Sequence, residues 1–441
     1  MALGLSGLHK RGPGPWWCDV RAAIVGLFLT ILQSATASAQ QAASPHEGDL
    51  WTRDVLTGNW DGERSALEDK GLLFGADTID EILGNPSGGT RQGVIYEGRL
   101  ELLTTINLEK TVGWTGATFH ANGYQIRGRG LSANDLGDTL EVASNIEAER
   151  SFRLFDLWVE QSLLNTALSI RAGQIAADDE FITSQTASLF INSTFGWPAI
   201  VATDLPDGGP AYPLATPGVR VKYAATDTLS AALGVFNGDP AGASATDPQS
   251  ADGSGTAFRF GGAAFAILEG AYAINQDPSA SGLAASYKIG AWFHSGPFPS
   301  PPGNTMPQTH QNDAGLYLVA DQALLHTGGD TGRLISVFAR LAIAPSDRNE
   351  VSLDGDAGVN FTGFIPGRDD DVIGVAASIA NVGTSEAVLE VTYQGQITPW
   401  WSMQPDLQFI RHPGGGIPPT GPGGSRIPDA TVFALRSAIV F

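Results

Sequence analysis

The chain has 441 residues, 55 glycines and a formal net charge of −21 at neutral pH. Nucleic acid is excluded as a partner of such an acidic protein, because two polyanions repel each other. The one cysteine is Cys18, in the amino-terminal segment, so the rest of the chain can form neither a disulfide nor a cysteine metal site.

The amino terminus has the pattern of a secretory signal. A basic stretch that ends at Arg21 precedes an apolar run from Ala22 to Leu32, and small residues follow at 37–39. The apolar run is too short to span a bilayer as a helix. We therefore predict a signal peptide over residues 1–39.

Residues 40–70 form the predicted lead-in to the main domain. They contain one short helical stretch, from Glu63 to Lys70, for which Asp61 is the expected N-cap. We place this lead-in on the periplasmic side and assign residues 71–441 to an outer-membrane barrel.

Apolar and polar residues alternate along the strand-length segments that begin at residue 71. In the segment 95–109, Leu100 and Leu102 share a face opposite Arg99 and Glu101. Successive side chains of a strand point to opposite faces, so one face meets lipid and the other meets a polar lumen. Barrel closure also leaves no unpaired strand edge in the bilayer.

The predicted fold class is therefore all-β, a transmembrane antiparallel barrel of sixteen strands. A soluble β-sandwich is the alternative, but it does not need so many long strands in one uninterrupted meander. The predicted strands are 71–82, 95–109, 114–127, 152–164, 166–175, 217–224, 227–237, 257–274, 282–294, 313–326, 331–345, 350–364, 371–382, 385–398, 400–411 and 429–441.

The connections alternate between short and long, and the longest is 176–216. With the amino terminus in the periplasm, the long connections face outside. The 176–216 loop carries apolar residues such as Phe181, Phe190 and Ile200, which require burial. We predict that this loop folds into the barrel and narrows it.

The same alternation selects the side chains that face the lumen. Opposed basic and acidic groups can hydrogen-bond to sugar hydroxyls, and aromatic rings can stack on a sugar. Charge pairing that only keeps the lumen solvated is the alternative for each residue. The predicted pore-lining or constriction residues are Arg99, Glu101, Asp156, Trp158, Asp179, Arg220, Asp321, Arg340, Glu390 and Asp406.

The chain shows no pattern of catalytic residues. The histidines after the predicted signal are scattered over unrelated segments, and no Ser/His/Asp spacing or metal-ligand cluster rises above chance. We therefore predict no enzymatic activity, no cofactor and no metal site.

Specific strings resemble the carbohydrate-selective porin (OprB) family over residues 50–441. They include LTGNWDGERSALEDKG at 56–71, RLFDLWVEQSLL at 153–164, DGGPAYPLATPGVRVKY at 207–223 and PGRDDDVIG at 366–374. This resemblance implies a sixteen-stranded barrel in a Gram-negative outer membrane, through which glucose-like monosaccharides diffuse passively.

The implied partners are carbohydrate solutes, outer-membrane lipid and lipopolysaccharide, and a homo-oligomer is left open. The acidic balance of the chain keeps a general or cation-preferring porin, which would pass ions without sugar selectivity, as the alternative function.

Overall fold

The computed structural model describes residues 46–137, 140–242, 247–277, 280, 282–301, 308–327, 332–382, 384–418 and 424–441. The predicted signal peptide lies outside these residues. Within them, no helix combines the length and the apolar character needed to cross a membrane.

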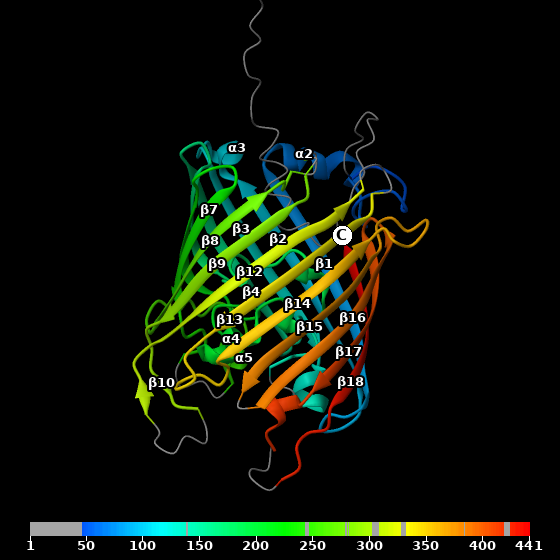
Figure 1. Ribbon diagram of the computed structural model, residues 1–441. Helices are drawn as coiled ribbons and strands as arrows, with labels where there is room; N and C mark the ends of the chain where they lie inside the picture. Colours follow the sequence, from blue (N-terminus) through cyan, green and yellow to red (C-terminus); the bar gives the residue numbers. More distant parts are fainter. Residues whose placement is uncertain are drawn as a thin grey trace, which may run out of the picture. The chain divides into compact units, whose positions relative to one another are not determined.

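Sixteen antiparallel strands form a closed barrel (Figure 1). They are β1 (Leu72–Ser87), β2 (Val94–Asn107), β3 (Ala117–Gly128), β4 (Ser151–Leu163), β5 (Leu168–Ile175), β6 (Thr216–Ala224), β7 (Leu229–Asn237), β8 (Ala264–Ile274), β9 (Ala285–His294), β12 (Asp313–His326), β13 (Leu334–Ile343), β14 (Leu353–Thr362), β15 (Val372–Val382), β16 (Thr384–Thr398), β17 (Trp401–Arg411) and β18 (Ala430–Val440).

Each strand pairs with the next one along the chain, and β18 closes the ring on β1. In the closing ladder Asp77 lies opposite Val440, and Ser87 lies opposite Thr431. Between β9 and β12 the chain forms a separate two-stranded sheet of β10 (Phe298–Pro299) and β11 (Thr309–His310). The predicted fold class is confirmed. Because every backbone edge is paired, this wall can cross a bilayer.

The predicted strands agree with the observed ones in number and order. The largest difference is at β8, which was predicted from residue 257 and begins at Ala264. Just before it, Gly262 adopts φ +116, a backbone conformation outside the extended region that strand pairing requires.

The wall has an apolar outside and a polar inside. Ile289 and Phe433 are exposed on the outer face, whereas Glu101, Arg340 and Glu390 are buried inside the ring. The difference follows from the two-residue period of a strand, which separates neighbouring side chains onto opposite faces.

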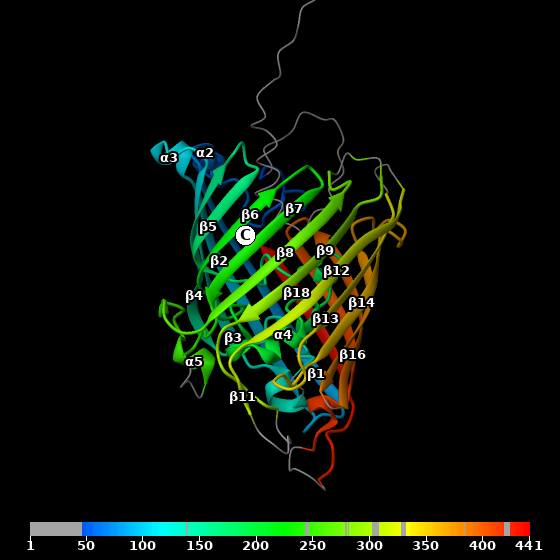
Figure 2. The same ribbon diagram turned by 60° about the vertical axis from the view of Figure 1, so that its left-hand side comes forward.

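The two ends of the barrel differ. The short helices α2 (Glu63–Asp69) and α3 (Leu108–Val112) lie at the end that carries the carboxyl terminus, whereas α5 (Pro248–Ala251) and β10 lie at the other end (Figures 1 and 2). Short turns face the periplasm in outer-membrane barrels, and long loops face outside. The end with α5 and β10 is therefore the extracellular one.

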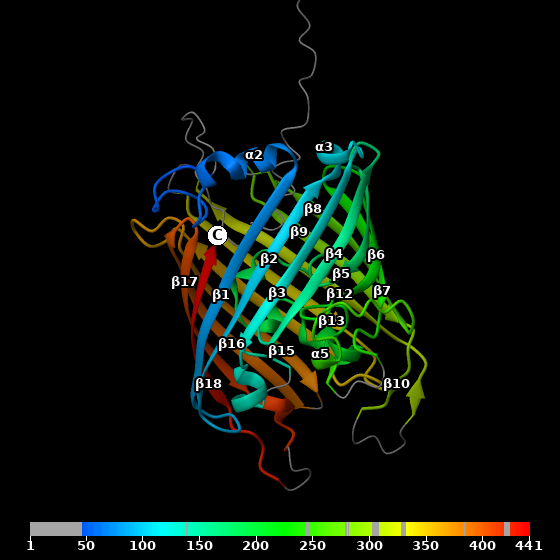
Figure 3. The same cartoon turned by 180° about the vertical axis from the view of Figure 1, so that it is seen from behind.

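The lead-in is bonded to the barrel rim at the end with the carboxyl terminus (Figure 3). The Leu56 N–H donates to the Val440 carbonyl at 2.8 Å, and the Arg64 guanidinium donates to the Phe441 carbonyl at 3.0 Å. The predicted short helix is confirmed as α2. The expected Asp61 N-cap is wrong, because Asp61 lies in the preceding 3-10 turn η2 (Trp60–Gly62) and Gly62 occupies the cap position with φ 97.

Candidate functional site

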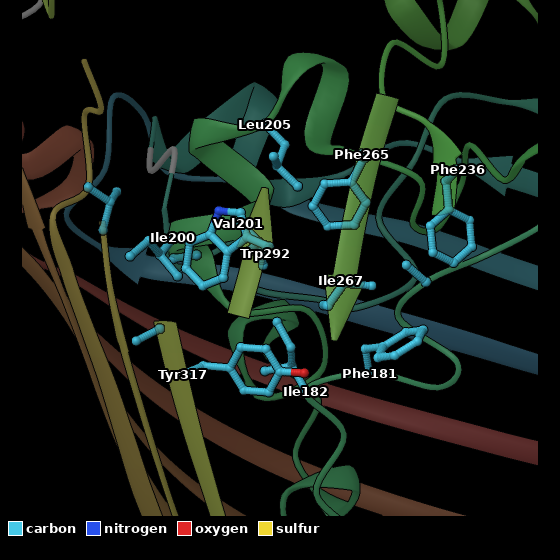
Figure 4. Close-up of a cluster of buried hydrophobic side chains, with 14 of the residues drawn as sticks. Phe181, Ile182, Ile200, Val201, Leu205, Phe236, Phe265, Ile267, Trp292 and Tyr317 are labelled. Atoms are coloured by element: carbon cyan, nitrogen blue, oxygen red, sulfur yellow. The ribbon is translucent and has the colours of Figure 1, made fainter. Parts of the chain in front are cut away.

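The loop between β5 and β6, residues 176–215, folds inside the barrel as predicted. It contains the 3-10 turns η4 (Ala187–Leu189), η5 (Ser193–Phe195) and η6 (Pro206–Gly208) and the helix α4 (Ala199–Asp204). Phe181 and Ile182 of the loop pack in one buried apolar cluster with the wall residues Trp292 and Tyr317 (Figure 4). Burial of these side chains removes apolar surface from water and holds the loop against the wall.

Backbone N–H groups of this loop are satisfied by carboxylates of the wall. Asp321 on β12 accepts from Thr186 N at 3.0 Å, and Glu390 on β16 accepts from Ile191 N at 2.8 Å and Asn192 N at 3.0 Å. A buried N–H without a partner is costly. These two predicted site residues therefore hold the loop to the barrel wall.

Arg340 on β13 binds the same loop through its carbonyl groups. Its guanidinium donates to the Thr194 carbonyl at 2.6 Å and the Gly196 carbonyl at 2.8 Å, and it is ion-paired with Asp356 at 2.7 Å. Asp406 lies on β17, four strands from Arg340, where it accepts a hydrogen bond from Gln408 at 3.1 Å. Arg340 thus links the loop to a buried carboxylate of the wall.

A second long loop, residues 129–150 between β3 and β4, also folds inward. Its Asn145 N–H donates to the Ile191 carbonyl at 2.7 Å, and the Ser193 N–H donates to the Val142 carbonyl at 2.9 Å. The loop leaves the wall at the extracellular end, as expected of a long connection, but it turns into the lumen, which was not predicted. Its inward path depends on these contacts with the 176–215 loop, which no local pattern of residues encodes.

On the opposite part of the wall, basic residues pair with carboxylates. Arg171 lies 2.9 Å from Glu160 and 2.8 Å from Glu180, and Arg220 lies 2.6 Å and 2.8 Å from the same two carboxylates. Arg171 also lies 3.8 Å above the centroid of the Trp158 ring. Burial acts to raise the pKa of Glu180, but the charges of Arg171 and Arg220 outweigh it and hold that pKa below its ordinary value. Glu180 therefore stays ionised and ties the loop to this wall.

Arg99 on β2 lies between aromatic rings and carboxylates. Its guanidinium is 4.7 Å from the Tyr124 ring centroid and 5.9 Å from that of Tyr212, a residue of the 176–215 loop. Asp77 lies at 3.8 Å and Glu101 at 3.6 Å, and the Arg99 side chain keeps 16% of its surface exposed. Planar donors, carboxylate acceptors and ring faces thus meet at one position.

Two neighbouring aspartates of the loop lie beside Asp156 of β4, which accepts a hydrogen bond from Ala176 N at 3.1 Å. Burial raises the pKa of Asp179 to about 6, although Asp156 and Arg171 act to lower it. Burial and the neighbouring Asp179 charge raise the pKa of Asp178 to about 8. Around neutral pH this acidic group therefore carries less negative charge than its composition suggests.

The ten predicted site residues thus fall into two groups. Asp321, Arg340, Glu390 and Asp406 lie on β12 to β17, where the first three hold the 176–215 loop. The other six lie on β2, β4 and β6 or on the loop itself, and they are Arg99, Glu101, Asp156, Trp158, Asp179 and Arg220. The structure therefore places the predicted residues on two different walls.

The prediction did not include Asp77, Tyr124, Glu180 and Tyr212. Strand alternation places Asp77 and Tyr124 on the inward face of their strands, so it could have found them. Glu180 and Tyr212 come from the loop, where alternation has no meaning.

A closed barrel with an apolar exterior, a polar interior and a loop folded into its lumen defines an outer-membrane porin. Residues 91–441 match the family described as carbohydrate-selective porin, OprB family. The chain belongs to this family, and it is a protein of the Gram-negative outer membrane.

Individual relatives agree with this assignment. Porin B of Pseudomonas aeruginosa is 22% identical over 86% of this chain and 90% of its own length. The high-pH structure of Pseudomonas putida OprB superposes with a TM-score of 0.76 at 22% identity, covering 90% of this chain and 100% of that one. The low-pH structure of the same protein has a TM-score of 0.58 at 20% identity and covers 89% of this chain and 99% of that one. These structures share the fold of this chain.

Proposed function

We propose that the barrel passes glucose-like monosaccharides by passive diffusion. The waist would lie between the 176–215 loop and the wall built by β2 to β6. The observation that carries this proposal is the arrangement around Arg99, where a guanidinium lies over an aromatic ring with two carboxylates beside it.

A sugar in transit must exchange hydrogen bonds with water for equivalent ones at the waist. Arg99 offers planar donors, and Asp77 and Glu101 offer acceptors at 3.8 Å and 3.6 Å from that guanidinium. The Tyr124 and Tyr212 rings offer apolar faces for the C–H side of a sugar ring. Asp179, Asp156, Trp158 and Arg220 would extend this lining, while Asp321, Arg340, Glu390 and Asp406 would set its width by positioning the loop.

Charge balance favours a neutral solute. Arg171 and Arg220 are compensated by Glu160 and Glu180. The raised pKa of Asp178, about 8, keeps that carboxyl largely protonated at neutral pH. The acidic composition of the whole chain therefore does not translate into an equally acidic waist. A general or cation-preferring channel is therefore the second candidate function.

Liposome swelling tests the proposal. Vesicles that contain the purified barrel are mixed with glucose, another hexose, and amino acids or polyols of matched size. Faster entry of the sugars is expected, and equal entry of all size-matched solutes would reject sugar selectivity. In planar bilayers, added glucose should reduce the ion current; a cation-selective current that ignores glucose would favour the general channel.

Transport without chemical conversion is part of the same proposal. Solutes recovered from the vesicles should be unchanged, and consumption of an ester or lipid substrate by the purified protein would contradict it. Lipid and lipopolysaccharide around the wall are the proposed partners besides the sugar, and the oligomeric state is a separate measurement.

A further inference from the structure

The outer face of the wall contains an ion pair near the extracellular ends of β2 and β3 and beside the middle of β1. Arg127 of β3 lies 2.7 Å from Asp80 of β1, and Tyr96 of β2 donates a hydrogen bond to the same carboxylate. Gly98 of β2 lies between these two side chains, and a Cβ there would lie 2.7 Å from Asp80 Oδ1 and 2.9 Å from Arg127 Nε. The neighbouring outward positions carry apolar residues such as Ile82 and Phe152. Charged groups on a lipid-facing wall require a polar environment.

A groove of about 320 Å³ lies next to this pair, at the extracellular ends of the same strands. It is lined by Val94, Ile95, Tyr96, Gly128, Arg129 and Arg150. Val94 and Tyr96 are exposed to 70% and 45%, so one side of the groove is apolar and open to lipid. The two arginines supply a basic side.

Gly128 allows the backbone conformation that forms this groove. It has φ +87, and a Cβ at this position would lie only 2.1 Å from the Tyr96 carbonyl. The backbone of β3 can therefore turn against β2, and the Arg129 N–H donates to that same carbonyl at 3.1 Å. The turn holds Arg129 at the groove.

The arginines at and beside this site differ in their ion pairing. Asp80 pairs with Arg127, and Asp135 pairs with Arg91 at 2.5 Å. Arg129 shares that same Asp135 carboxyl group at 3.6 Å. Within the part of the chain that the structure describes, Arg150 forms no ion pair. Two more carboxylates lie nearby, Glu147 beside Gly130 and Glu149 directly before Arg150 in the chain, but among the described residues neither forms an ion pair with Arg129 or Arg150. The Arg150 guanidinium is therefore available to a ligand.

We propose that this groove binds lipid A, the phosphorylated glycolipid anchor of lipopolysaccharide in the outer leaflet. A lipid A phosphate lies between Arg129 and Arg150, because guanidinium groups bind phosphate through paired N–H donors. An acyl chain runs along Val94, Tyr96 and Phe152 toward the bilayer centre. The site is at the extracellular rim, which is the level of lipid A head groups.

A second copy of this chain is a less suitable occupant. In a two-fold contact the same surface patch meets itself, which would bring the arginines of both copies together. A phosphate supplies the opposite charge, and an acyl chain matches the open apolar side. The proposal depends on the outer-membrane location and does not depend on which solute the lumen passes.

Native mass spectrometry of the full barrel, refolded from material free of lipopolysaccharide, tests the proposal. Diphosphorylated lipid A is titrated against the wild type, Arg150→Gln and the double variant Arg129→Gln/Arg150→Gln. Arg411→Gln is the matched control, because Arg411 is an exposed arginine at the extracellular end of β17, three strands away from β2. Migration of the unheated protein on SDS gels verifies that each variant is folded.

One tightly bound lipid A per barrel is expected, with affinity reduced about fivefold in Arg150→Gln and tenfold or more in the double variant. The control should change less than twofold. Because Arg150 forms no ion pair with any residue that the structure describes, its single variant keeps the test valid if the double variant misfolds.

Lipid A without phosphates, phosphatidylglycerol and inorganic phosphate are the competing probes, and each should bind at least tenfold more weakly. Equal binding of the dephosphorylated lipid, equal binding of free phosphate, or unchanged affinity in Arg150→Gln would overturn the proposal. Dimers or trimers that dissociate in the arginine variants would instead assign the groove to a second copy of the chain. Sugar entry in the swelling assay remains a separate readout, so failure of one proposal leaves the other standing.

Discussion

The two sides of the barrel interior use ionisable residues in different ways. On β8 to β17, carboxylates such as Asp321 and Glu390 accept hydrogen bonds from the backbone of the 176–215 loop, and Arg340 donates to loop carbonyls. On β2 to β6, arginines pair with side-chain carboxylates and aromatic rings instead. The first side holds the loop, and the second side is the surface that we propose the solute meets.

Removal of Arg340 should have the largest effect on the side of the barrel that holds the 176–215 loop. Arg340→Ala leaves Asp356 as a buried charge without its partner and leaves three loop carbonyls without their donor. We expect a loss of about 3–5 kcal/mol in the free energy of unfolding. Denaturant unfolding in detergent measures it. Arg411, an exposed arginine that forms no ion pair with the described residues, is the control, and Arg411→Ala should cost less than about 1 kcal/mol.

A milder change on the same side is Glu390→Gln. One acceptor oxygen becomes an NH₂ group that faces a loop N–H, so a buried donor loses its partner. The expected loss is about 1–3 kcal/mol. Single-channel recording should also show larger current fluctuations as the loop loosens. Glu350→Gln, at an exposed position, should leave both measurements unchanged.

Arg99→Ala tests the side that would meet solute. The variant removes the planar donors over Tyr124, and glucose entry relative to a size-matched polyol should fall about fivefold, equivalent to about 1 kcal/mol. Arg99→Lys keeps the charge without the planar group and should give an intermediate value. If Arg99→Ala leaves the ratio unchanged while Arg340→Ala alters it, loop position and not the arginine surface determines sugar entry.

The smallest expected effect is a pH dependence from Asp178 and Asp179. Their raised pKa values, about 8 and about 6, mean that both carboxyls are protonated in acid and ionise as the pH rises. Cation preference should therefore increase by up to about twofold between pH 5 and pH 9, in steps near pH 6 and pH 8. Stability should fall over the same range, because a carboxyl with a raised folded-state pKa binds more protons folded than unfolded.

Reversal potentials in a KCl gradient measure that preference. The double variant Asp178→Asn/Asp179→Asn should show no steps between pH 5 and pH 9. Steps that persist in this variant would place the titrating groups elsewhere in the lumen.

Much of the wall could be predicted from the sequence. Strand alternation is local and has a period of two. The lumen-facing orientation of Arg99, Arg340 and Glu390 could therefore be predicted from their neighbours in the chain. The sixteen strands and their order followed from the same pattern and from the lengths of the connections.

Helix capping and the path of the long loops did not follow from it. At the lead-in helix, Gly62 takes the cap position because the preceding turn already contains Asp61. At the 129–150 loop, the apolar residues Leu131 and Ile146 are fully buried, but they are too few and too irregularly spaced to predict an inward path.

Which inward residue contacts a loop and which does not was decided by the tertiary structure alone. Asp321 meets Thr186 across 135 residues, and Glu390 meets Ile191 across 199. Such contacts depend on the register of all sixteen strands and on the route of the loop between them. The sequence by itself determined which face of each strand a residue occupies, because that depends only on the alternation of neighbouring side chains. The tertiary structure decided which partner each residue meets on that face, because closure of the barrel brings together residues that no local rule connects.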